Sequence, residues 1–295
     1  MTHKSGFVNI IGKPNVGKST LVNALVGEKM SIINSKPQTT RHRIFSILNE
    51  ERFQIVFSDT PGLIQRPAYK MQDKMNRFAY STFEDADIFL VVTDGGKPDE
   101  IPPKALLKLK GADVPKILVV NKADSLSESA IEQSIFEWEK EVSFIKTLVI
   151  SALHKINTGL VLDIILKNLP VGPAYYPKDQ LTDKPERFFI SEIIRNQILN
   201  LYHQEIPYSA EVIVTSFTEA EGKDLIKIAA EIVVERKSQK PIIIGKGGKG
   251  IKQLGIESRK EIEAFLDRHV FLELFVKVKD NWRDDERFLR EFGYN

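Results

Sequence analysis

Gly12-Lys13-Pro14-Asn15-Val16-Gly17-Lys18-Ser19 fits the pattern G-x-x-x-x-G-K-[ST], a glycine-rich loop that binds phosphate. The residues before it, 7–11 (Phe-Val-Asn-Ile-Ile), predict a short buried strand, and residues 20–26 carry apolar side chains at helical spacing. Glycines let backbone N–H groups converge on phosphate oxygens, and the start of a helix adds positive potential. Because strand, loop and helix occur in this order, we expect a nucleoside triphosphate site rather than an incidental glycine-rich turn.

The residue types in this loop predict its contacts. We expect the Lys18 ammonium to reach the β- and γ-phosphates and the Ser19 hydroxyl to bind Mg²⁺. Thr20, which follows directly, is expected to contact the nucleotide together with the whole of Gly12–Ser19.

The composition is that of a globular chain of 295 residues with a formal net charge of +2, long enough for two domains. Cysteine is absent, which excludes disulfides, thiol nucleophiles and zinc–thiolate sites and suits a reducing compartment. No apolar run approaches the ~20 residues of a membrane span, and the first strand begins too early for a signal peptide. We therefore expect a cytoplasmic protein.

Residues 1–170 alternate strand-like apolar runs with helix-like segments, which predicts a doubly wound α/β domain with a mostly parallel sheet. In such a sheet the ligand-binding loops lie at the C-terminal ends of the strands. We expect strands at residues 43–49 and 52–58, paired as a hairpin, and at 86–93, 116–121 and 147–151, with helices at 104–110, 129–144 and 158–169.

The composition then changes. Residues 171–185 are rich in proline and predict a semi-rigid linker, followed by an α+β domain at residues 186–295 with a different order of elements. We expect a helix at 186–203, strands at 210–217 and 225–235, a helix that carries Ile251, Leu254, Ile262 and Phe265, and a last strand at 270–278.

Two motifs at strand ends select the nucleobase. Asn121-Lys122-Ala123-Asp124 matches N-K-x-D, in which the aspartate accepts hydrogen bonds from guanine N1–H and the 2-amino group while the asparagine bonds O6 and N7. Adenine lacks both donors, and each buried polar group left unpaired costs about 1–3 kcal/mol. Ser151-Ala152-Leu153 fits the supporting S-A-x loop. These motifs predict GTP and GDP as ligands.

Asp59-Thr60-Pro61-Gly62 fits D-x-x-G, in which the aspartate contacts the metal through water and the glycine N–H contacts the γ-phosphate. A threonine upstream of it should close over Mg²⁺ when the γ-phosphate is present. Thr39 and Thr40 are both candidates, and we expect Thr40 because GTPase families with a Thr-Arg pair at this point use the threonine before the arginine. The expected metal-binding residues are Ser19, Thr40 and Asp59.

The residue after D-x-x-G is Leu63, where Ras-like enzymes place a glutamine that orients the attacking water. A leucine cannot do this. Asn15 either coordinates K⁺, which then supplies the positive charge of an arginine finger, or only shapes the loop. The first role predicts slow hydrolysis that is faster in K⁺ than in Na⁺. The expected catalytic residues are Asn15, Lys18, Thr40 and Gly62.

A local basic patch marks the second domain, with six Lys/Arg and no acidic residue from Arg236 to Lys252. Within it, Gly245-Lys246-Gly247-Gly248 fits the G-x-x-G turn of a KH domain, whose backbone clamps single-stranded RNA. The order of predicted elements around the turn is that of a type II KH fold; a second phosphate site or a solvated loop is the alternative. The expected RNA-binding residues are Lys240, Ile244, Gly245, Lys246, Gly247, Gly248, Lys249, Lys252, Trp282 and Arg283.

These motifs together resemble the Era family of GTPases over nearly the whole chain. Further marks of the resemblance are residues 36–43 (Lys-Pro-Gln-Thr-Thr-Arg-His-Arg), 182–187 (Thr-Asp-Lys-Pro-Glu-Arg) and 277–283 (Lys-Val-Lys-Asp-Asn-Trp-Arg). The resemblance implies an Mg²⁺-dependent GTPase that binds 16S ribosomal RNA near its 3′ end and assists assembly of the small ribosomal subunit. It also implies loose association with the inner face of the cell membrane, and we expect a monomer.

Two questions stay open at this stage, one about the C-terminal segment and one about how RNA binding is controlled. The aromatic and basic residues at 282–294 would either stack on RNA bases or form an amphipathic helix that caps the core. RNA binding would either respond to the bound nucleotide, with GTP favouring the RNA-competent state, or be constitutive, with the nucleotide only supporting the fold.

Overall fold

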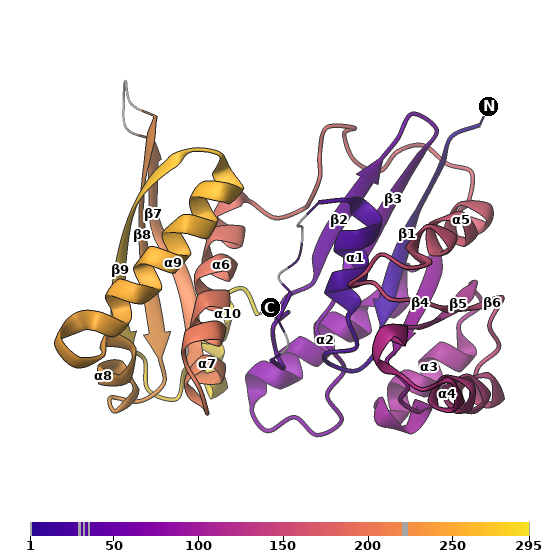
Figure 1. Ribbon diagram of the computed structural model, residues 1–295, viewed down its shortest axis with the longest axis horizontal. Coiled ribbons are helices and arrows are strands. Elements are labelled where there is room, and N and C mark those ends of the chain that lie inside the picture. Colours follow the sequence, from indigo (N-terminus) through magenta and orange to yellow (C-terminus); the bar gives the residue numbers. More distant parts are fainter. Residues whose placement is uncertain (1, 29–30, 32, 35, 220–223, 295) are drawn as a thin grey trace. The chain divides into compact units, whose positions relative to one another are not determined.

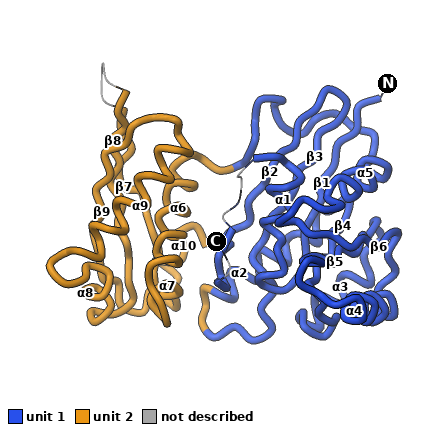
Figure 2. Tube along the Cα trace, in the orientation of Figure 1, with its two compact units in different colours: residues 1–68, 72–183 blue, residues 69–71, 184–295 orange. Residues whose placement is uncertain are grey.

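The computed structural model describes residues 2–28, 31, 33–34, 36–219 and 224–294. It divides into two compact units (Figure 2), the first made of residues 1–68 and 72–183 and the second of residues 69–71 and 184–295. Among the described residues, no helix has the length and apolar character needed to cross a membrane.

The first unit has a six-stranded sheet with helices on both faces (Figure 1). The strand order is β2-β3-β1-β4-β5-β6, with β2 antiparallel to β3 and every other neighbouring pair parallel. This confirms the predicted α/β class and the predicted hairpin. The strands are β1 (Lys4–Ile11), β2 (Ile44–Asn49), β3 (Phe53–Asp59), β4 (Ile88–Thr93), β5 (Lys116–Val120) and β6 (Lys146–Val149).

The helices of this unit form two layers because the central strands are apolar on both faces. Helices α1 and α5 share one core cluster with the sheet, and α2, α3 and α4 share the other. Helix α2 has no counterpart among the predicted elements, although Met71, Met75 and Ala79 are buried at a spacing of four residues. The helices are α1 (Lys18–Val26), α2 (Lys70–Asp85), α3 (Pro103–Gly111), α4 (Glu128–Glu141) and α5 (Thr158–Asn168).

The segment predicted as a linker is bonded to the first unit over most of its length. The Gln54 side chain on β3 accepts a hydrogen bond from the Tyr175 N–H at 2.7 Å, and the Ile47 N–H on β2 donates to the Leu181 carbonyl at 2.8 Å. Residues 175–183 therefore run along the β2–β3 hairpin, and the division between the units falls after Asp183.

Apart from the four-residue α7 and the C-terminal α10, the second unit has the order helix, strand, strand, helix, helix, strand that is expected of a type II KH fold. Strand β8 is central, antiparallel to β7 and parallel to β9. Alternate residues along β8 are buried, namely Ile226, Ile228, Ala230, Ile232 and Val234. The elements are α6 (Glu186–Leu201), α7 (Ile206–Ser209), β7 (Ala210–Glu219), β8 (Leu225–Val234), α8 (Gln239–Ile244), α9 (Lys249–Leu266), β9 (His269–Val278) and α10 (Glu286–Glu291).

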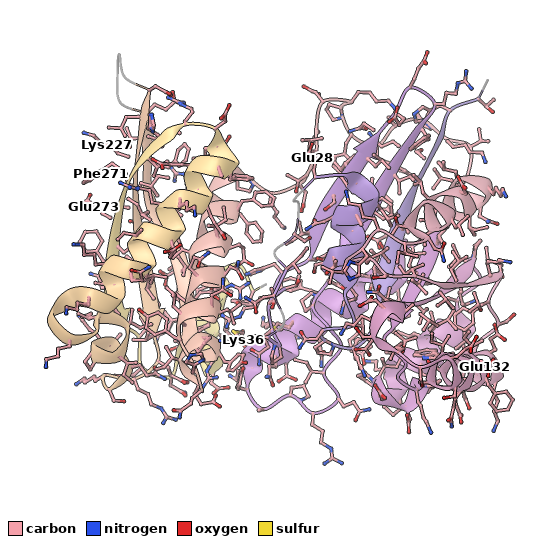
Figure 3. The ribbon with its side chains drawn as sticks, viewed as in Figure 1. Glu28, Lys36, Glu132, Lys227, Phe271 and Glu273 are labelled. Carbon is pink, nitrogen blue, oxygen red and sulfur yellow. The ribbon has the colours of Figure 1, made fainter. Side chains whose placement is uncertain are left out.

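The two faces of this three-stranded sheet differ. Helices α6 and α9 contribute Ile194, Ile198 and Leu254 to the core on one face. Lys227 and Phe271 are exposed and point away from those helices (Figure 3). The helical face therefore holds the core of the unit.

Candidate functional site

A cavity of about 350 Å³ lies in the first unit among the loops that follow β1, β3, β5 and β6. This is the edge at which a doubly wound sheet is expected to bind its ligand. The predicted residues that line it are Pro14, Asn15, Gly17, Lys18, Ser19, Thr20, Thr40, Thr60, Gly62, Asn121, Lys122, Asp124, Ser151 and Leu153. Others of the predicted set, Gly12, Val16, Asp59, Pro61 and Ala152, are buried and do not line it.

The phosphate loop has the backbone that its glycines predict. Gly17 has φ 92° and Asn15 has φ 66°, both in the left-handed region. A Cβ atom on Gly12 would lie 2.3 Å from the Val92 carbonyl oxygen of β4, so only glycine allows this approach. The loop turns tightly from β1 into α1, whose first residue is Lys18.

Lys18 bonds the loop that carries it. Its ammonium donates to the carbonyl oxygens of Gly12 at 3.1 Å and Lys13 at 2.9 Å. The side chain is nearly inaccessible to solvent, and burial lowers its pKa from 10.5 to about 8, against the opposing effect of Asp59 and Asp94. A phosphate group would supply the negative charge that this buried ammonium lacks.

The expected metal-binding oxygens lie together. The Ser19 hydroxyl donates to Asp59 Oδ2 at 2.6 Å and lies 3.0 Å from the Thr40 hydroxyl oxygen. Burial raises the pKa of Asp59, although Ser19 and Lys18 oppose this effect. Asp59 Oδ1 is buried without a hydrogen-bond partner among the described residues. Hydroxyl and carboxylate oxygens suit Mg²⁺, which prefers hard ligands.

The structure distinguishes the two threonines. Thr40 lies beside Ser19, whereas the Thr39 hydroxyl donates to the Lys36 carbonyl oxygen at 2.7 Å. The Thr39 side chain is therefore already used within its own loop, and Thr40 is the one that faces the metal-binding corner.

Asn121 holds two loops together. Its Nδ2 donates to the Val16 carbonyl at 2.9 Å, and its Oδ1 accepts from the Ala152 N–H at 2.9 Å. One amide hydrogen remains for the guanine acceptors O6 and N7. The contacts of Asn121 with guanine stay a prediction, and the side chain also connects the phosphate loop to the S-A-x loop.

Asp124 is arranged as an acceptor. The hydroxyls of Ser151 and Ser125 donate to its two carboxylate oxygens. These bonds, the one from Ser151 above all, lower the pKa of Asp124. The carboxylate therefore stays ionised at neutral pH, as acceptance from guanine N1–H and the 2-amino group requires.

The D-x-x-G loop packs directly on the phosphate loop. A Cβ atom on Gly62 would lie 2.4 Å from the Pro14 nitrogen, which explains the glycine. Leu63 is only 3% exposed and packs in the core cluster of α2, α3 and α4. Leu63, at the position where Ras-like enzymes have a catalytic glutamine, therefore lies outside the cavity.

Asp94 is a charged residue beside the site that the motifs did not reveal. It follows β4, and its carboxylate lies within ion-pair distance of Lys13 and Lys122, one from each of two predicted motifs. Its place after a central parallel strand was the available signal, because all such strand ends meet at the ligand-binding edge.

The glycine-rich turn of the second unit lies between α8 and α9. Gly245, Gly247 and Gly248 have φ values of 71°, 61° and 78°, a region that favours glycine. A Cβ atom on Gly247 or Gly248 would meet nothing within 4 Å, so the turn is open to a ligand. The exposed lysines around it are Lys240, Lys246, Lys249 and Lys252, and Ile244 is half-buried at its start.

The C-terminal segment caps the core of the second unit. Trp282 is fully buried, and its indole N–H donates to the Ser209 carbonyl at 2.9 Å. The prediction that Trp282 stacks on bases is wrong, because no ring face is accessible. The Arg283 guanidinium, also predicted to contact RNA, forms an ion pair with the buried Glu235. Of the two alternatives for this segment, the capping role fits.

Comparison with known proteins assigns both units to known domain families. Residues 7–122 match the 50S ribosome-binding GTPase family, and residues 205–283 match the KH domain family. The chain is 46% identical to the GTPase Era of Syntrophus aciditrophicus (strain SB) over 295 residues, which is 99% of this chain and 95% of the relative. It is 44% identical to the GTPase Era of Alkaliphilus oremlandii (strain OhILAs) over the full length of both.

Two solved structures have the same fold, each with a TM-score of 0.92, 37% identity and 99% of both chains covered. One is a variant of Aquifex aeolicus Era bound to GDP·AlF4⁻, and the other is Era in complex with MgGDPNP and nucleotides 1506–1542 of 16S ribosomal RNA. The chain therefore belongs to the Era family, GTP-hydrolysing enzymes that carry a KH domain after the GTPase domain.

Proposed function

We propose that this GTPase binds 16S ribosomal RNA near its 3′ end through the turn Gly245–Gly248 and assists assembly of the small ribosomal subunit. The observation that carries the proposal is the open glycine turn, with positive φ values and no atom over Gly247 or Gly248. The 16S fragment bound to the related Era supports this class of RNA.

The turn suits a nucleic-acid backbone for two reasons. Without Cβ atoms at Gly247 and Gly248, a sugar-phosphate chain can lie directly against the peptide. The exposed lysines 240, 246, 249 and 252 attract phosphates. For each phosphate contact, the logarithm of the association constant should fall by about 0.7 when the salt concentration rises tenfold. The bases would then be read by other groups, such as Ile244 at the start of the turn.

The nucleotide would control RNA binding through the segment that contains Thr40. Ser19 and Thr40 would hold Mg²⁺, which would supply positive charge at the γ-phosphate when bound. Thr40 is already 3.0 Å from Ser19 and lies only four residues before β2 begins. GTP would hold this threonine in place, and GDP would release it. A tenfold difference in RNA affinity between the two states requires about 1.4 kcal/mol of differential binding.

For hydrolysis we propose that K⁺ binds beside Asn15. This residue lines the cavity, and its backbone has φ 66°. The amide oxygen is a suitable ligand for a monovalent cation, whereas Leu63 is buried in the core and cannot order water. Hydrolysis should accelerate when Na⁺ is replaced by K⁺. Equal rates in the two salts, or K⁺ dependence that persists in Asn15→Asp, would contradict this role.

The RNA proposal is tested by fluorescence anisotropy with a labelled oligoribonucleotide of the 16S 3′ end, in GDPNP and in GDP. We expect Gly248→Asp to lower RNA affinity at least tenfold, because it places a negative side chain on the clamp. Gly111→Asp is the matched control, since it adds the same charge at an open position in the other unit. Unchanged RNA binding by Gly248→Asp would overturn the site, and equal affinity in the two nucleotides would overturn only the switch.

Assembly is tested in cells whose own copy is depleted. We expect precursors of the small subunit to accumulate on depletion. A wild-type copy supplied in trans should sediment with these precursors in the cytoplasmic fraction, with a smaller share in the membrane pellet. Lys18→Ala should fail to restore assembly. Full restoration by Lys18→Ala would instead support a constitutive RNA-binding module in which the nucleotide is structural.

A further inference from the structure

Asp94 connects the two ends of the nucleotide pocket. Its Oδ1 lies 3.1 Å from Lys13 Nζ in the phosphate loop, and its Oδ2 lies 3.0 Å from Lys122 Nζ in the N-K-x-D loop. The Asp94 side chain is 19% exposed, while those of Lys13 and Lys122 are 31% and 41% exposed. One carboxylate therefore lies within ion-pair distance of two lysines that come from separate motifs, and the Lys13 ammonium also donates to the Glu100 carboxylate.

The loop that carries Asp94 is fixed by its own hydrogen bonds. The Gly96 carbonyl oxygen accepts from Thr93 Oγ1 at 3.1 Å, from Ser134 Oγ at 2.8 Å and from Trp138 Nε1 at 3.1 Å. The Asn121 N–H donates to the Thr93 carbonyl at 2.8 Å. Since these bonds join the loop to α4 and to the N-K-x-D strand, Asp94 is held in place by the fold itself.

Each lysine bound by Asp94 has a second connection to the nucleotide site. The Lys13 carbonyl accepts from Lys18 Nζ at 2.9 Å, so the position of Lys13 bears on the ammonium that faces the phosphates. Lys122 lines the cavity two residues before Asp124 and has φ 60°. Its side chain extends from there to Asp94 along the base end of the cavity.

The charges favour the shared arrangement. Burial alone would raise the pKa of Asp94, but hydrogen bonds and charge from Lys122 and Lys13 hold it below its usual value. A single exposed ion pair contributes little because water screens it. A half-buried carboxylate on a rigid loop between two cations loses less conformational entropy when the ion pairs form, and water screens its charge less.

We propose that Asp94 is a positioning residue for guanine nucleotides, which holds the phosphate loop and the base loop in register through Lys13 and Lys122. It touches neither the phosphates nor the base in this role. A pocket whose two ends are fixed before the ligand arrives loses less freedom on binding, so the nucleotide binds more tightly.

The test compares Asp94→Asn with wild type by titration and stopped-flow release of a fluorescent GDP. Asparagine keeps the shape and removes the charge. We expect the dissociation constant to rise about tenfold, which is about 1.4 kcal/mol, mostly through faster release. Asp113→Asn removes an exposed carboxylate from the loop after α3 and is expected to leave GDP binding unchanged. A change of less than twofold in Asp94→Asn would overturn the proposal.

Two further readouts separate positioning from a general effect on folding. The ratio of GDP to IDP affinity should stay constant in Asp94→Asn, because Asp124, which contacts the 2-amino group, is untouched. In a Lys13→Met/Lys122→Met background, Asp94→Asn should change GDP affinity by less than threefold. The same tenfold loss in that background would show that Asp94 acts otherwise, and the proposal would be wrong.

Discussion

Replacing Lys18 with methionine is expected to stabilise the nucleotide-free protein at neutral pH while removing nucleotide binding. Lys18 is buried, and its pKa falls from 10.5 to about 8. The two pKa values differ by about 2.5, and each pKa unit corresponds to about 1.4 kcal/mol. The folded state therefore disfavours the charged form of Lys18 by about 3 kcal/mol relative to the unfolded chain. Methionine has a similar length and carries no charge.

Part of this gain is lost again. The variant leaves the carbonyl oxygens of Gly12 and Lys13 without their ammonium donor. Each lost hydrogen bond costs about 1 kcal/mol. The net expectation is that Lys18→Met unfolds with a free energy about 1 kcal/mol higher than wild type at pH 7.5.

The sign of the difference should reverse with pH. Between the folded pKa of about 8 and the unfolded value of 10.5, the unfolded chain binds more protons at Lys18, so wild-type stability rises with pH. From pH 7.5 to 9.5 the wild type should gain about 2 kcal/mol relative to the variant. At pH 9.5 the wild type should therefore be the more stable protein.

The assay is urea denaturation in EDTA, followed by tryptophan fluorescence. Trp138 lies in the first unit, where the substitution is, and Trp282 lies in the second unit. The second unit is the same in wild type and Lys18→Met, so a difference between the two unfolding curves reports the first unit. With Mg²⁺ and GDP at 100 times the dissociation constant, wild type alone should gain about 2.7 kcal/mol. A stability difference that does not change with pH, or a variant that is less stable at pH 7.5, would refute the reasoning.

Three other substitutions test the sites. Asp124→Asn should lower GDP affinity roughly 100-fold in a displacement titration, because an amide cannot accept from both guanine donors; retained affinity would show that Asp124 does not contact the base. Thr40→Ala should weaken Mg²⁺-dependent binding of a GTP analogue about tenfold and leave GDP binding intact. The control Thr39→Ala should change neither affinity. Equal losses in the two variants would contradict the choice of Thr40. Trp282→Ala should lower the free energy of unfolding of the second unit by about 3–5 kcal/mol in urea; a stable variant that has lost RNA binding would restore the stacking role.

The sequence alone determined the two-domain architecture and the identity of the motifs. Phosphate loops and glycine turns depend on a few neighbouring residues, because a backbone at positive φ or at a helix start binds a ligand through local geometry. The convergence of Gly12–Ser19, Asp59–Gly62 and Asn121–Asp124 also followed, since parallel strands present their C-terminal ends at one edge. Helix α2 was missed although Met71, Met75 and Ala79 were spaced as a helix requires.

Only the tertiary structure decided which distant side chains meet. Asn121 is committed to Val16 and Ala152, and Trp282 is enclosed by the second unit. Asp94 lies between two lysines 81 and 28 residues away in the chain, as follows from their numbers. Periodicity in a sequence shows which face of an element is buried, but not which partner fills the space against it. That choice is made by packing among elements far apart in the chain, where a shift of a few ångströms makes or breaks a hydrogen bond.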